Sequence, residues 1–117
     1  MQPISPFSLH VQRVSRPAAQ KLSDLPKEEQ AIFRHIKKTV IATLGKCEVY
    51  ACGSRVRGNP SLEGAKISDY DVMIVGADLA IRKQGLNDRL TEAVQEKHPK
   101  VRVDVFFNEI LPNIIIL

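Results

Sequence analysis

Residues 50–75 bring a glycine turn and two acids close together in the sequence. Gly53 and Ser54 follow a short apolar run at residues 49–52, which is typical of a buried strand. A glycine lets the backbone approach a ligand because it has no Cβ, and the free N–H groups of a helix that begins at Ser54 favour an anion. Arg55 and Arg57 add positive charge beside the turn. The pattern predicts a phosphate-binding turn, with Arg57 preferred over Arg55 as the arginine that contacts phosphate; an ordinary surface position is the alternative for both arginines.

Asp69 and Asp71 lie directly before the apolar residues 72–75. Residues i and i+2 of a strand point to the same face, so both carboxylates are expected side by side, with Tyr70 on the opposite, core face. Two carboxylates this close repel each other unless a cation lies between them or one is protonated. Mg²⁺ prefers carboxylate oxygens and commonly binds together with substrate phosphates. Next to a phosphate-binding turn, this pair indicates chemistry on a nucleoside triphosphate.

A third acid lies in residues 101–107, which read Val-Arg-Val-Asp-Val-Phe-Phe and give a strong strand signal. Arg102, Asp104 and Phe106 share one face of that strand, and the valines share the other. If the strand lies next to the one that carries Asp69 and Asp71, Asp104 completes a cluster of three carboxylates.

These residues, taken in order, resemble the DNA polymerase β-type nucleotidyltransferase superfamily, and in particular its minimal nucleotidyltransferases. Members of that group often read Gly-Ser-Arg-x-Arg-Gly and Ser-Asp-x-Asp, as this chain does at residues 53–58 and 68–71 before the lone Asp104. The resemblance covers residues 47–107. Residues 59–66 depart from the pattern, because they lengthen the spacing between the turn and the first acid; their proline and glycine predict a loop.

The resemblance implies an enzyme that transfers a nucleoside monophosphate from a nucleoside triphosphate, with ATP the expected donor, to a hydroxyl group and releases pyrophosphate. It implies two Mg²⁺ ions. The residues that it assigns are Asp69, Asp71 and Asp104 as catalytic metal ligands, and Gly53, Ser54 and Arg57 as nucleotide-binding residues. The acceptor stays open between a protein, an RNA and a small molecule. A HEPN-type partner protein modified with AMP, or the end of a transfer RNA, is what the family suggests.

The elements that position these residues alternate between helices and strands. A helix with apolar residues at helical spacing is expected from Ser23 or Asp24 to Gly45, and strands are expected at residues 48–52, 69–75 and 101–107. A short helix follows Ser54, and another runs from Leu86 to about residue 97. This order predicts an α/β (α+β) domain with a small mixed sheet and flanking helices, which is also the polymerase β-like fold that the resemblance implies.

Composition fits one domain at residues 23–117, preceded by a flexible basic arm at residues 1–22. The net charge is +4, and no apolar run approaches the ~20 residues of a membrane span, so a cytoplasmic protein is expected. Cys47 and Cys52 are expected as separate small thiols. The apolar residues 114–117 are expected to pack on a sheet edge or against another chain, as a homo- or hetero-oligomer.

Two other functions are consistent with the same residues. The chain could be a non-catalytic, antitoxin-like module of the same fold that binds a partner protein through the apolar tail and the basic arm. It could also bind RNA through the arm, since a basic segment attracts phosphate. Substitution of Asp71 separates the first alternative from an enzyme, and removal of residues 1–22 tests the second.

Overall fold

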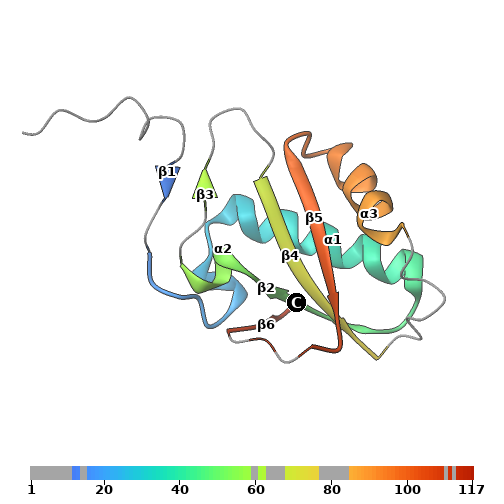
Figure 1. The fold of residues 1–117 in the computed structure, drawn as a ribbon, viewed down its shortest axis with the longest axis horizontal. Coiled ribbons are helices and arrows are strands. Elements are labelled where there is room, and N and C mark those ends of the chain that lie inside the picture. The colour runs from blue at the N-terminus through green and yellow to red at the C-terminus, as the bar shows by residue number, and fades with distance from the viewer. Residues whose placement is uncertain are drawn as a thin grey trace, which may run out of the picture.

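A four-stranded mixed sheet forms the centre of the chain in the computed structural model, which describes residues 12–13, 16–58, 61–62, 68–76, 85–109, 111 and 113–117. The strand order is β5-β4-β2-β6 (Figure 1). The bounds are Glu48–Cys52 for β2, Ser68–Val75 for β4, Val101–Phe107 for β5 and Ile115–Ile116 for β6. Strands β4 and β5 run parallel, whereas β2 is antiparallel to both β4 and β6. The predicted small mixed sheet and the three longer strands are confirmed.

Three α-helices accompany the sheet in the described part of the chain: α1 (Lys27–Leu44), α2 (Ser54–Arg57) and α3 (Leu86–Gln95). The predicted start of the first helix is too early. A 3-10 turn, η2 (Leu22–Asp24), occupies that position, and α1 begins after Pro26. A proline pushes the preceding residue out of the helical region, and Leu25 is accordingly extended. Gly45 ends α1 as predicted, with its N–H bonded to the carbonyl oxygen of Ile41.

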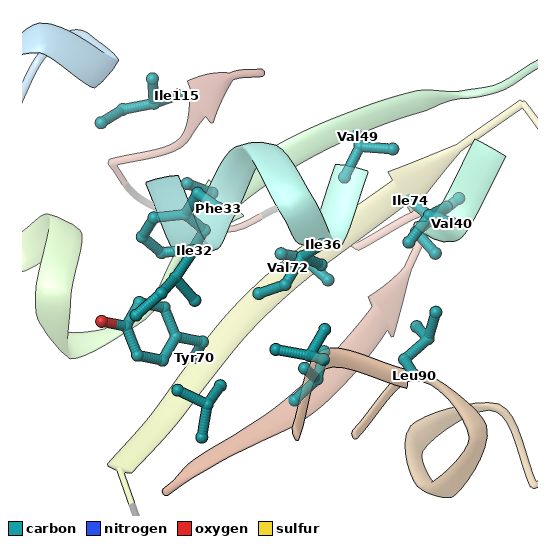
Figure 2. Packing of buried hydrophobic residues seen from close by; sticks show 14 of the residues in the cluster. Ile32, Phe33, Ile36, Val40, Val49, Tyr70, Val72, Ile74, Leu90 and Ile115 are labelled. Carbon is teal, nitrogen blue, oxygen red and sulfur yellow. The ribbon is translucent and has the colours of Figure 1, made fainter. Parts of the chain in front are cut away.

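The hydrophobic core lies between one face of the sheet and the two long helices. Figure 2 shows side chains of α1, including Phe33, Ile36 and Val40, packed over Val72 and Ile74 of β4. From α3, Leu86, Leu90 and Val94 enter the same core. Tyr70 is buried there as predicted. The alternation of each strand therefore sends Asp69, Asp71 and Asp104 to the opposite face, which neither α1 nor α3 covers.

The C-terminal residues complete the sheet, as expected for an apolar tail. Ile115 is buried and pairs with Ala51, and the N–H of Leu117 bonds to the carbonyl oxygen of Val49 at 2.9 Å. Lys37 of α1 donates a hydrogen bond to the Leu117 carbonyl oxygen. The tail thus forms β6 at the edge beyond β2, and the prediction that it packs on a sheet edge is confirmed.

The segment before η2 packs along α2. Backbone N–H groups of Arg16 and Ala19 donate to the carbonyl oxygens of Gly58 and Val56, both at 2.8 Å, and Ala19 is buried. Strand β1 (Gln12–Arg13) pairs antiparallel with β3 (Ser61–Leu62), so the predicted loop over residues 59–66 contains a short strand. The rest of that loop, and residues 1–11 and 14–15 of the predicted arm, lie outside the described residues.

None of the helices in the described ranges has both the length and the apolar character needed to cross a membrane.

Candidate active site

The predicted acids lie on neighbouring strands. Strands β4 and β5 pair so that Asp71 stands opposite Asp104 and Asp69 stands opposite Arg102. All four side chains point to the face away from the helices, because their neighbours Tyr70 and Val103 fill the core. Strand β5 is therefore the neighbour of β4, which is the condition that the sequence set for a cluster of three carboxylates.

Gly53 brings the predicted phosphate-binding turn against this acidic row. It ends β2, precedes α2, and has φ of 83° and ψ of −165°, a backbone conformation that essentially only glycine adopts. A Cβ at this position would lie 2.7 Å from Cγ of Asp71. The turn can approach the carboxylate this closely only because residue 53 has no side chain.

A pocket of about 160 Å³ lies where the turn meets the acids. Three residues of the predicted site line it, namely Gly53, Arg57 and Asp71; its other lining residues are Cys52, Phe106 and Leu111. Ser54, Asp69 and Asp104 do not line it. Ser54 begins α2 next to Gly53, and the two aspartates flank Asp71 along β4 and across to β5. The lining of the pocket combines charged and apolar side chains.

The electrostatics of this row centre on Asp71. Partial burial first, and then the negative charges of Asp104 and Asp69, raise its pKa to about 6 against the lowering effect of Arg57 and Arg55. A carboxyl with this pKa exchanges its proton near neutral pH, and its perturbation by two neighbouring acids is typical of functional sites. The thiol of Cys52, by contrast, has its pKa raised to about 12 by burial and then by Asp71, so it stays protonated and unreactive.

The acids share a face of the sheet, but they do not form a compact group of metal ligands. Among the residues that the structure describes, no three His, Cys, Asp or Glu side chains form a group that could hold a metal ion. Asp104 instead contacts Arg102, with Oδ1 3.5 Å from a guanidinium nitrogen, in a pair that is largely exposed to solvent. An exposed pair of this kind is weak, so it does not fix Asp104 in place. The carboxylate donor set itself suits Mg²⁺, because three acids share one face of two adjacent strands.

Arg55 has a structural role that the sequence did not reveal. The residue is only 6% exposed, so the alternative of an ordinary surface position is wrong for Arg55. The guanidinium carbon lies 4.0 Å from the ring centroid of Tyr70, and Nε donates to the backbone carbonyl oxygen of Asp69 at 3.0 Å. Arg55 thereby ties α2 directly to the strand that carries the acids.

A buried carboxylate, Glu29 of α1, holds this arginine and a second one. Arg16 donates two hydrogen bonds to Glu29, at 2.7 and 2.9 Å, and a third to the carbonyl oxygen of Arg55 at 2.8 Å. A guanidinium nitrogen of Arg55 lies 3.2 Å from Oε2 of the same carboxylate, an oxygen that Arg16 also contacts. Glu29 is 8% exposed, so the two arginines satisfy a charge that would otherwise be costly to bury. The network joins the N-terminal segment, α1, α2 and β4 behind the acidic row.

A larger pocket, of about 290 Å³, lies between the start of α1 and the start of β5. Glu28, His98 and Lys100 are among its lining residues, and none of the predicted site residues reaches it. It is open, and its charges have both signs. The smaller pocket beside Asp71 is therefore the better candidate site, because chemically suited groups converge there.

Comparison with known proteins adds no family to this picture: no family model, no curated protein and no solved structure matches the chain.

Proposed function

We propose that the chain is a Mg²⁺-dependent nucleotidyltransferase with a polymerase β-like fold. It would transfer a nucleoside monophosphate from a nucleoside triphosphate, with ATP the expected donor, to a hydroxyl group of a protein, RNA or small-molecule acceptor. The proposal rests on the sequence resemblance and on one structural observation. A glycine turn packs directly against a carboxylate of raised pKa, and a second carboxylate stands opposite it on the next strand.

Acidic and phosphate-suited groups lie together at one place, and this supports the proposed function over a purely structural role for these residues. An acidic row alone repels phosphate, and a glycine turn alone is common. Here the turn, Arg57 and Asp71 line one pocket, so groups suited to phosphate and a carboxylate suited to a metal ion meet within it. A cation held by the acids would relieve the repulsion that raises the Asp71 pKa, and it would let phosphates approach. The residues therefore fit a magnesium ion bound together with a triphosphate.

The roles follow from position. Asp71, with Asp69 and Asp104, would hold Mg²⁺, which supplies charge that offsets the phosphate oxygens and the leaving pyrophosphate. The backbone at Gly53 and the hydroxyl of Ser54 would bind the terminal phosphates, and exposed Arg57 would add a two-pronged contact. Asp104 would accept the proton of the acceptor hydroxyl. The hydroxyl oxygen then bonds to the α-phosphorus as the bond to pyrophosphate breaks.

Calorimetric titration tests the proposal. ATP, GTP, CTP and UTP are titrated in turn into the full chain with Mg²⁺ and then with EDTA. We expect at least one nucleotide to bind with Mg²⁺ only, and the binding to be lost in Asp71→Asn. Glu92→Gln, which removes an exposed acid of α3, is the matched control and should bind like the wild type. A folded wild-type chain that binds no nucleotide would refute the proposal.

One observation favours a second candidate, a protein-binding module. Strand β6 forms an edge of the sheet, and Ile114 and Ile116 beside it are 38% and 65% exposed. Exposed apolar residues on an open sheet edge are suited to contact with another chain. This candidate becomes the leading one if no nucleotide binds. Ile116→Asp should then abolish partner binding while the unfolding free energy stays unchanged.

A further inference from the structure

An apolar row crosses the face of the sheet that carries the acids, beside the acidic row. In the strand register Phe106 stands opposite Met73, Met73 opposite Tyr50, and Tyr50 opposite Ile116. The acids lie two residues away along each strand, in the next row on the same face, with Asp104 opposite Asp71 and Asp71 opposite Cys52. Successive side chains on one face of a strand are about 7 Å apart, so the two rows are direct neighbours.

The glycine turn, the acids and the apolar row follow one another along this face of the sheet. The turn at Gly53 and Ser54 lies beyond the end of β2, on the side where β4 begins. The acids follow, and the apolar row comes next. A ligand whose terminal phosphates lie at the turn, with its α-phosphate at Asp71, therefore has its nucleoside directed toward the apolar row.

Within that row, Phe106 is the residue that can receive a planar ring. It lines the pocket together with Asp71 and Gly53, and it is 36% exposed, whereas Met73 is buried at 3%. The hydroxyl of Tyr50 is held by Glu48 at 2.5 Å. The pocket, at about 160 Å³, is smaller than the ~300 Å³ or more that whole small-molecule ligands usually need. It accommodates phosphate groups, and the rest of a nucleotide must then lie outside it, over the exposed ring of Phe106.

We propose that Phe106 is the stacking platform for the nucleobase of the bound triphosphate. This inference rests on the proposed function, because it names a further part of the same site. Every nucleobase has a π-face, so an aromatic ring can stack against any of the four bases. Phe106 therefore contributes affinity for the nucleoside part, and it favours the larger purine rings over pyrimidines.

The test compares ATP with inorganic tripolyphosphate, which carries the phosphates without a base. Both are titrated with Mg²⁺ into wild type, Phe106→Leu and Phe106→Tyr, with urea unfolding to confirm that each variant is folded. Ile41→Ala, on α1, removes a similarly exposed apolar side chain away from the site and is the control. We expect Phe106→Leu to weaken ATP binding about tenfold and to leave tripolyphosphate binding unchanged. Phe106→Tyr, which keeps the ring, should restore ATP binding.

A spectroscopic readout accompanies the affinities. The H2 and H8 protons of adenine should move upfield when ATP binds to wild type, because a stacked aromatic ring shields them, and this shift should be absent in Phe106→Leu. Equal ATP binding by Phe106→Leu and wild type would refute the stacking role and leave the proposed function standing. Failure of tripolyphosphate and of all four nucleoside triphosphates to bind folded wild type would refute the proposed function, and the stacking role with it.

Discussion

Replacing Asp71 with asparagine should make the protein more stable at neutral pH, and it should remove the magnesium-dependent nucleotide binding that we propose. The pKa of Asp71 is raised from 3.8 to about 6 in the folded chain, first by burial and then by Asp104 and Asp69. The folded state thus holds a proton that the unfolded chain releases at lower pH. The free energy of unfolding falls as pH rises from about 4 to about 6, and it stays lower above that range.

The size of the effect follows from the same values. The difference between 3.8 and about 6 corresponds to roughly 3 kcal/mol at pH 7.5. Because the carboxyl is still partly solvated, screening reduces this to about 1–2 kcal/mol. Asparagine has nearly the same shape and no charge, so Asp71→Asn should gain that amount at pH 7.5, or roughly 4–8 °C in Tm, and much less at pH 4.

Urea unfolding of wild type and variant at pH 4 and pH 7.5, without divalent cations, measures this difference. Glu92→Gln controls for the loss of one negative charge from an exposed position on α3. Addition of Mg²⁺ at pH 7.5 should then stabilise wild type more than Asp71→Asn. The reasoning is refuted if Asp71→Asn is less stable than wild type at pH 7.5, or if the stability difference is the same at both pH values.

Three further changes test the architecture by urea unfolding. Gly45→Ala should lower the free energy of unfolding by about 1–3 kcal/mol from backbone strain alone, since φ is +85° and the space around it is open. Gly53→Ala should cost at least about 1 kcal/mol more, because its Cβ overlaps the carboxylate of Asp71. Equal costs would contradict that overlap. Glu29→Gln should cost about 3 kcal/mol, because two arginines lose their shared buried carboxylate, and a cost below 1 kcal/mol would show that the network contributes little. Ile115→Asp should cost about 3 kcal/mol or more, and Ile116→Asp less than about 0.5 kcal/mol; similar costs would contradict the alternation of β6.

The sequence predicted the elements whose signals are local. Strand β2 matches its predicted bounds, β4 begins one residue before its predicted start, and Gly45 ends α1 where it was expected to. The β1–β3 pair was missed, because two-residue strands are defined by a partner almost fifty residues away and carry no periodic pattern of their own. The start of α1 was misplaced because Ser23 and Asp24 resemble helix caps, while Pro26 decides where the helix can begin.

The features of the candidate site also divide into those that local sequence predicts and those that depend on packing. That Asp69 and Asp71 share a face follows from strand alternation, and it needed no structure. The placement of Asp104 opposite Asp71 depends on which strands are neighbours, and the sequence could state it only as a condition. The contact between Gly53 and Asp71 and the exposure of Phe106 depend on packing, so no spacing rule predicts them.

Arg55 and Arg57 show why residue type and spacing do not assign roles within a short helix. Two positions apart on a helix correspond to about 200° of rotation, so the two side chains must point in nearly opposite directions. Arg55 meets Glu29 and Tyr70 and is buried, while Arg57 faces the pocket and stays exposed. One arginine therefore fixes α2 against the acid-bearing strand, and this leaves the other free to contact a ligand. The exposed positive charge beside the turn is therefore set by the orientation of α2, and not by the number of arginines in the motif.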